Sequence, residues 1–197
     1  GYTVTDTFGY KKINKISVMQ LSKDGQKVVG SKINLYCDCL GVSGGWTPAV
    51  HLFTQSGGKL KFREEDQIFV PNTYPSDQLS IGACNGDLTL DEILEKTPNS
   101  LKEFFNIKNT EYDNLEVSSS TNKSKRNIWL LPSDKILGKT KSFVDFQNDA
   151  TAKDIKLALR EGFRSIEHVK RYTTTGMGTD QGKLGNMHAL GIISETA

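Results

Sequence analysis

The chain has 197 residues, enough for one full domain or two small ones, and its 36% hydrophobic and 24% charged residues are typical of a soluble globular protein. A formal net charge of only +2 indicates no nucleic-acid partner. No apolar run is long enough for a membrane span, and the N-terminal run GYTVTDTFGYKK lacks the apolar core of a signal peptide. We therefore expect a cytoplasmic protein without membrane contact.

Residues 1–105 are predicted to form a mixed α/β region. Apolar runs typical of strands cover residues 13–21 and 27–40, and the Asp-Gly turn signal at Asp24 lies between them. Residues 35–42 are apolar apart from one aspartate. This pattern is typical of a strand that is buried on both faces.

The three cysteines indicate a reducing environment rather than a disulfide framework. Their number is odd, and no histidine stands at zinc-site spacing from them. Cys37 and Cys39 lie two residues apart, so a strand would point both side chains to one face. We interpret these residues and Cys84 as buried structural thiols and predict no metal site.

Two glycine-containing turns are candidate ligand positions in this region. Gly44 and Gly45 follow the predicted buried strand, at the edge where open α/β sheets bind nucleotides. A second predicted strand, residues 79–83, leads into a turn with Gly86. Thr89 is then the expected N-cap of a helix over residues 90–94.

The character of the sequence changes after residue 105. Residues 106–127 are rich in Ser, Asn and charged residues, which indicates a linker or mobile loop; an anion site in SSSTNKSKR is the alternative. Residues 128–197 are predicted to be a small, mostly helical domain. An apolar anchor, IWLLP, begins this domain.

Three helices are expected in the C-terminal domain. Thr151 begins the first with a capping-box pattern, and Gly162 is its expected C-cap. Ser165 begins the second, which the Gly-Met-Gly run at 176–178 ends. A third helix is expected from Gly182 or Gly185 to about residue 194.

Several familiar catalytic motifs are incomplete in this chain. The run Gly138-Lys139-Thr140 imitates the end of a phosphate-binding loop, but Ser133 stands where that motif requires glycine. No GxGxxG run occurs. No Ser-His-Asp, Cys-His or paired-carboxylate arrangement can be argued, so we predict no catalytic residue.

Three consecutive sequence words resemble one family closely. They are FVDFQNDATAKDI from residue 143, REGFRSIEHVKRYTT from residue 160, and GMGTDQGK from residue 176. They resemble the alpha subunit of bacterial heterotetrameric sarcosine oxidase, as does the word SGGWTP from residue 43 with the HL that follows it. The resemblance implies that the chain is a central piece of such a subunit and is inactive by itself.

The resemblance also implies the activity and partners of the parent enzyme. That enzyme demethylates sarcosine oxidatively to glycine, hydrogen peroxide and formaldehyde or methylene-tetrahydrofolate. It contains beta, gamma and delta subunits, NAD in the alpha subunit and FMN between the alpha and beta subunits. FAD and tetrahydrofolate lie elsewhere in it. The alternatives are a non-catalytic interaction adaptor and an alpha-like subunit of a related amine or amino-acid dehydrogenase.

The resemblance implies that residues 1–105 are the end of a nucleotide-binding domain of the disulfide-oxidoreductase type. The edge of its NAD site would then include five residues. These are Gly44, Gly45, Gly82, Gly86 and Leu88. The alternative for each glycine is that it only shapes a turn.

The helical domain also resembles the [2Fe–2S] domain of bacterioferritin-associated ferredoxin. The cysteine positions of that family correspond here to Asp145, Gln147, Asp180 and Gly185, none of which supplies a thiolate. We expect the fold without the iron–sulfur cluster.

The last implied site is the contact with FMN and the beta subunit. Its candidate residues are Lys170, Arg171, Thr173, Thr174 and Lys183. Cationic side chains and hydroxyls at helix ends suit a phosphate group. The alternative is a solvated basic helix face.

Overall fold

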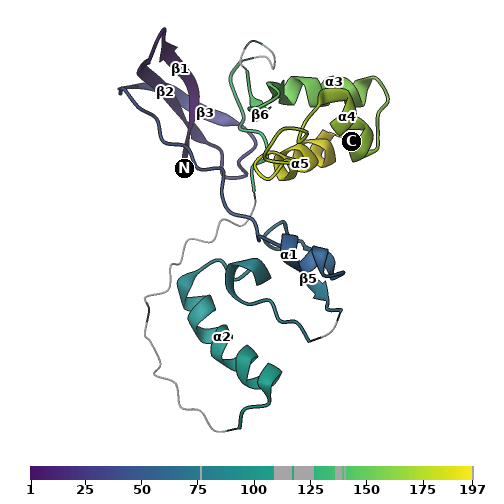
Figure 1. Ribbon diagram of the computed structural model, residues 1–197. Coiled ribbons are helices and arrows are strands. Elements are labelled where there is room, and N and C mark those ends of the chain that lie inside the picture. Colours follow the sequence, from purple (N-terminus) through teal and green to yellow (C-terminus); the bar gives the residue numbers. More distant parts are fainter. Residues whose placement is uncertain (76, 109–116, 118–126, 136–138, 140, 197) are drawn as a thin grey trace. The chain divides into compact units, whose positions relative to one another are not determined.

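The computed structural model describes residues 1–75, 77–108, 117, 127–135, 139 and 141–196. By their contacts, Gly1–Gly41 and Ile128–Ala197 form one unit and Val42–Asn127 form a second. The chain is mixed α/β, with small antiparallel sheets and C-terminal helices (Figure 1). This grouping divides residues 1–105 between the two units, and the sequence domains proposed above stay predictions.

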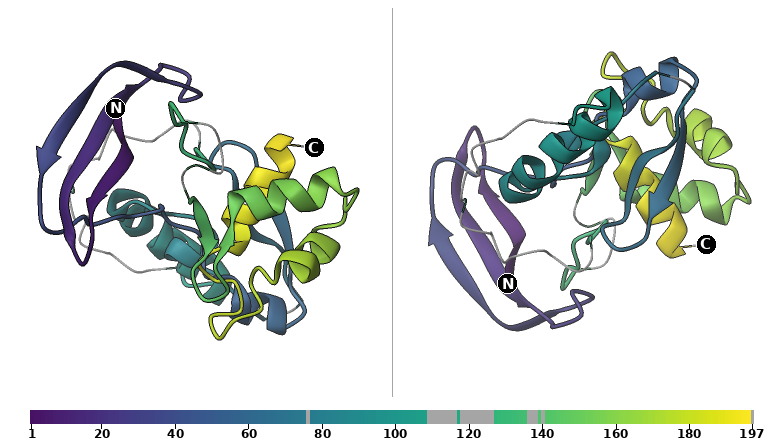
Figure 2. Two further views of the ribbon diagram at one scale, coloured as in Figure 1. Left: turned by 90° about the horizontal axis from the view of Figure 1, so that it is seen from above. Right: turned by 90° about the horizontal axis from the view of Figure 1, so that it is seen from below.

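The first unit begins with a three-stranded antiparallel sheet in the order β1-β2-β3. Its strands are β1 Tyr2–Gly9, β2 Ile13–Leu21 and β3 Val28–Tyr36, and the curved sheet is visible in both views of Figure 2. The predicted turn between β2 and β3 is confirmed. There the Asp24 carboxylate accepts hydrogen bonds from the Ser22 hydroxyl and the Gln26 backbone N–H.

The prediction of a strand over residues 35–42 buried on both faces is wrong. Strand β3 ends at Tyr36, Leu35 is 47% exposed and Val42 is 83% exposed. The reason is that β3 is an edge strand of an antiparallel sheet, and an apolar run alone does not distinguish such a strand from a central one. The cysteines that follow β3 are not on a strand either, and Cys39 is exposed rather than buried.

The second unit contains two short helices, a hairpin and one long helix. Its elements are α1 His51–Gln55, β4 Lys59–Arg63, β5 Ile68–Thr73, the 3₁₀ helix η1 Gly82–Asn85 and α2 Leu90–Phe105. Strands β4 and β5 pair antiparallel. The buried apolar side chains of this unit include Phe53, Ile68 and Val70.

Two predictions for the second unit need correction. No strand covers residues 79–83, because Gly82 has φ +66° and begins η1 instead. The predicted helix after Thr89 is present but extends to Phe105. The Thr89 side chain does not cap it, since its buried hydroxyl has no hydrogen-bond partner among the described residues.

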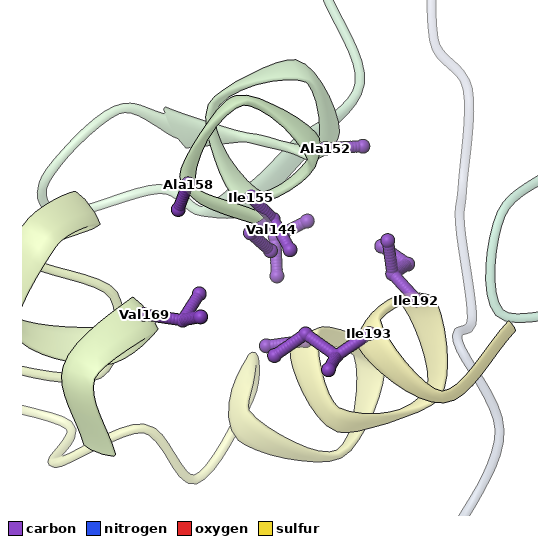
Figure 3. Packing of buried hydrophobic residues seen from close by; sticks show 8 residues of the cluster. Val144, Ala152, Ile155, Ala158, Val169, Ile192 and Ile193 are labelled. Atoms are coloured by element: carbon purple, nitrogen blue, oxygen red, sulfur yellow. The ribbon is translucent and has the colours of Figure 1, made fainter. Parts of the chain in front are cut away.

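The C-terminal part of the first unit is a helical region, residues 143–196. Its elements are β6 Phe143–Asp145, β7 Ala150–Thr151, α3 Ala152–Arg160, α4 Ile166–Thr173 and α5 Asn186–Thr196. Figure 3 shows aliphatic side chains from β6, α3, α4 and α5 pointing toward one another. The members of this core are Val144, Ala152, Ile155, Ala158, Val169, Ala189, Ile192 and Ile193.

Helix α3 has the ends that the sequence predicts. The Thr151 hydroxyl accepts from the Asp154 N–H at 3.4 Å, and the Asp154 carboxylate accepts from the Thr151 N–H at 2.9 Å, so the capping box is confirmed. At the C-terminal end, the Gly162 N–H donates to Leu159 and the Phe163 N–H to Ala158. Gly162 has φ +96°, the left-handed conformation of a Schellman cap.

Residues 128–135 connect the sheet to the helical region within the first unit. The Trp129 ring packs directly against Gly191 of α5, where a Cβ atom would overlap it. On the sheet side, Lys32 pairs with Asp134 at 2.8 Å and Asp6 pairs with Lys135. No helix within the described ranges is long and apolar enough to cross a membrane.

Candidate functional site

The turn after β6 and the loop after α4 meet through the side chain of Asp145. Its Oδ2 atom accepts from the Gly176 N–H at 2.7 Å, and its Oδ1 atom accepts from the backbone N–H groups of Gln147 at 2.8 Å and Asn148 at 3.0 Å. The carboxylate therefore joins two segments about thirty residues apart in the chain.

Two further side chains of the same turn bond to the loop. The Gln147 Oε1 atom accepts from the Thr179 N–H at 2.5 Å and from the Thr179 hydroxyl at 2.9 Å. The Asn148 amide donates to the Thr174 carbonyl at 3.2 Å. We call this set, Asp145, Gln147 and Asn148, the clamp, and we call residues 174–185 the clamped loop.

The clamped loop is also held from within and by close packing. Asp180 accepts from the N–H groups of Gly182 at 3.2 Å and Leu184 at 3.3 Å. A Cβ atom at Gly185 would overlap the carbonyl oxygen of Val144 on β6. Only glycine allows the loop to approach the strand this closely.

Four positions of this chain correspond to the cluster-binding cysteines of the ferredoxin-like family, and the structure shows what the residues there do instead. Asp145, Gln147 and Asp180 already accept hydrogen bonds from the loop, and Gly185 has no side chain. This donor set does not suit an iron–sulfur cluster, which requires thiolates. No group of three or more His, Cys, Asp or Glu suited to a metal occurs in the part of the chain that is described.

The Asp145 carboxylate is ionised near neutral pH. It is 6% exposed, and burial by itself would raise its pKa. The hydrogen bonds from Asn148, Gly176 and Gln147 outweigh burial, so the net pKa lies below its ordinary value. Hydrogen bonds to a buried carboxylate are strong and directional, so Asp145 holds the clamped loop and the turn after β6 together.

The predicted FMN-contact residues differ in availability. Arg171 and Lys183 are exposed and Lys170 is half-buried. Thr173 is buried, and its hydroxyl donates to the Val169 carbonyl at 2.8 Å and lies 2.7 Å from the Thr175 hydroxyl. Arg171 and Lys183 are thus open to solvent, whereas the Thr173 hydroxyl bonds within the end of α4.

The Thr174 hydroxyl is also used within the chain. It donates to the Thr173 carbonyl at 2.6 Å, and Thr174 itself has φ +59° as the C-cap residue that follows α4. Its assignment to the FMN contact stays a prediction, as do those of the other four residues.

The glycines predicted at the NAD edge have different surroundings in the second unit. A Cβ atom at Gly86 would lie 2.7 Å from Val70 Cγ1, and the Arg63 guanidinium donates to the Gly86 carbonyl at 2.7 Å. Packing within the unit thus accounts for Gly86. Gly45, by contrast, has open space around its missing Cβ, and Leu88 is 39% exposed.

One partly buried ion pair of the second unit was not expected from the sequence. Asp87 is 4% exposed, and its Oδ1 atom lies 2.6 Å from the Lys96 ammonium of α2. A charge nine residues before a lysine carries no periodic signal, so only the fold reveals the pair. It anchors α2 beside η1.

The helical region, including the clamped loop, lies within residues 139–197, which match the family described as the sarcosine oxidase A3 domain. The whole chain is similar to curated sarcosine oxidase alpha subunits. That of Rhizobium meliloti (strain 1021) is 36% identical over 163 residues, 80% of this chain and 16% of the relative. That of Corynebacterium sp. (strain P-1) is 31% identical over 205 residues, 98% of this chain and 21% of the relative.

The chain is therefore homologous to a segment of the sarcosine oxidase alpha subunit and contains its A3 domain. This confirms the resemblance noted in the sequence. The chain spans 16–21% of the length of these relatives.

One solved structure has a similar fold. The crystal structure of L-proline dehydrogenase from P. horikoshii matches with a TM-score of 0.52 and 16% sequence identity. The match covers 98% of this chain and 38% of that one.

Proposed function

We propose that this chain acts as part of the alpha subunit of a sarcosine oxidase. The parent complex would convert sarcosine to glycine, hydrogen peroxide and formaldehyde or methylene-tetrahydrofolate, with FAD and tetrahydrofolate held outside this chain. The observation that best supports this proposal is the 31% identity to one alpha subunit over 98% of the chain. We assign no catalytic residue to this segment.

Within that complex, the helical region would scaffold the contact with the beta subunit and FMN. FMN, when bound, supplies the redox chemistry. Lys170 and Arg171 stand in the last turn of α4, and Lys183 lies in the clamped loop. A phosphate or a partner carboxylate would form charge-assisted hydrogen bonds with these groups. The gamma and delta subunits would bind elsewhere.

The second unit would contribute only an edge of the NAD site. The open space at Gly45 and the exposed Leu88 suit a ligand surface, whereas the packing of Gly86 has a structural cause. We attribute the fold of this unit to the end of a nucleotide-binding domain, and that of the helical region to a ferredoxin-like domain without its cluster.

The activity is tested by co-expressing the full-length alpha polypeptide with beta, gamma and delta subunits of a sarcosine oxidase from the same organism. We expect hydrogen peroxide formation that depends on sarcosine. Turnover of another secondary amine or amino acid without sarcosine activity would favour the related-dehydrogenase alternative. A polypeptide that binds no flavin-containing subunit would favour the adaptor.

The docking role is tested with Lys170→Ala combined with Arg171→Ala in the same complex. The matched control is Lys156→Ala with Arg160→Ala on α3, which likewise combines a half-buried lysine with an exposed arginine. We expect the first pair to reduce FMN content or beta-subunit assembly while the melting temperature of the isolated chain stays nearly unchanged. Equal behaviour of the two pairs in the complex would contradict the role.

A further inference from the structure

We infer that Asp145 and Gln147 are positioning residues that hold the clamped loop ready to dock onto a protein surface. This inference rests on the proposed function, because the surface in question is that of the beta subunit. Neither residue needs to touch that subunit. Each would act through the loop backbone that it fixes.

The first support is the density of bonds across the two segments. The clamp makes four hydrogen bonds to the loop, to the N–H of Gly176, the carbonyl of Thr174 and the N–H and hydroxyl of Thr179. All four come from three residues of the four-residue segment 145–148. Such bonds fix the loop at three residues, Thr174, Gly176 and Thr179.

The second support is a strained residue at the start of the loop. Thr174 has φ +59°, a conformation that a β-branched residue rarely adopts. Strain of this kind persists where surrounding contacts impose it, and it gathers at binding sites. Here the Asn148 amide holds the Thr174 carbonyl, while the Gly176 N–H two residues later is held by Asp145.

The third support is what the clamp and the loop leave exposed. Met177 follows the bonded Gly176 and is 54% exposed, and Leu184 precedes the tightly packed Gly185 and is 71% exposed. Phe146, between the two clamp residues Asp145 and Gln147, is 70% exposed. Large apolar side chains on a fixed backbone are typical of protein–protein contacts, because their ordering cost has already been met.

The partner is therefore a protein surface with an apolar patch and acidic groups near it. The exposed Lys183 stands directly beside Leu184 and supplies the complementary charge. The beta subunit is the occupant to which we commit.

The test uses Asp145→Asn in the complete complex, with hydrogen exchange and beta-subunit affinity as two readouts. Asparagine keeps the shape but has only one acceptor oxygen, so the loop or the turn loses bonds to a charged group. We expect faster amide exchange in residues 174–185 with unchanged protection of α3 and α5. We also expect beta-subunit affinity to fall roughly tenfold or more.

A second pair of variants separates positioning from general structural support. Gln147→Glu keeps an acceptor oxygen for both Thr179 donors, whereas Gln147→Ala removes it. We expect Glu to retain a slow-exchanging loop and normal affinity, and Ala to lose both. This milder pair also gives an answer if Asp145→Asn does not fold.

The outcomes distinguish this inference from the proposed docking charges. In one outcome, Asp145→Asn loosens the loop and weakens assembly while Lys170→Ala with Arg171→Ala has no effect. That result would support the positioning role of the clamp and contradict the proposed docking role of the two charges. If the loop loosens and assembly stays normal, the positioning role is overturned. Unchanged exchange in residues 174–185 overturns it as well.

Discussion

The helical region, residues 143–196, and the second unit, residues 42–127, bury their side chains to different extents. In the helical region, Ala152, Ile155 and Ala158 of α3 are fully buried, and α5 adds Ile192 at 2% exposure. In the second unit, the longest helix, α2, contributes no buried residue. Leu90 and Phe105 at its two ends are 59% and 63% exposed.

Among the described residues, the helices of the helical region share a core of buried side chains, whereas the long helix of the second unit adds none. A helix is stabilised mostly by packing of its apolar face, and α2 buries none of its own residues among the described part of the chain; its described contacts include the Lys96–Asp87 ion pair and contacts to η1. The helical region is also the one that matches a domain family.

The largest expected effect comes from truncating the closed core. Replacing Ile155 by alanine should lower the free energy of unfolding by about 2–5 kcal/mol, because a cavity remains among α3, α4 and α5. The matched change in the second unit, Leu90→Ala at the exposed start of α2, should lower the free energy of unfolding by less than about 0.5 kcal/mol. Denaturant unfolding of both variants measures the contrast, and similar losses would refute it.

The close approach of the clamped loop to β6 gives the second prediction. Gly185→Ala should destabilise the helical region by about 1–3 kcal/mol, because the new methyl group meets the fixed carbonyl of Val144. Gly41, where a Cβ atom would meet nothing within 4 Å, is the control for an added methyl group. Thermal melting of both alanine variants should show a loss only at residue 185.

The two threonine N-caps compare the same residue type in the two regions. Thr151→Ala removes a formed capping box and should cost about 0.5–2 kcal/mol. Thr89→Ala removes a hydroxyl that makes no capping bond and should cost almost nothing. If the two alanine variants lost equal stability in denaturant unfolding, the described difference between α3 and α2 would be incorrect.

The smallest effect is expected at the ion pairs between the sheet and residues 128–135. Hydrogen bonding to Lys135 is the main reason that the pKa of Asp6 lies below its ordinary value. Its stabilisation is therefore present at neutral pH and is lost as the pH falls through the lowered pKa. Asp6→Asn should lower the melting temperature slightly at pH 7 and not at all at a pH below the lowered pKa of Asp6. Added salt should reduce the difference in melting temperature between the two proteins at pH 7.

The sequence was most informative where local chemistry decides the structure. The capping box at Thr151, the Gly162 cap and the turn at Asp24 follow from side-chain bonds within a few residues, and all three are present. Helix α5 also begins and ends close to its predicted limits.

The errors and omissions concern contacts between distant segments. The apolar run at 35–42 contains no information on whether a neighbouring strand exists on each side, and β3 proved to be an edge. The clamp joins Asp145 to Gly176, thirty-one residues away, so no periodicity reveals it. The available signal was an aspartate that ends a short strand and is followed by the polar residues Gln147 and Asn148.

Hydrogen exchange of the whole chain, resolved by residue, tests the central contrast most directly. We predict that amides of α3 around Ile155 and of α5 around Ile192 exchange only through global unfolding of the helical region. The amides of α2 should exchange much faster, through local opening. Protection in α2 equal to that in α3 would contradict the account, since it would require a packed core that α2 does not have.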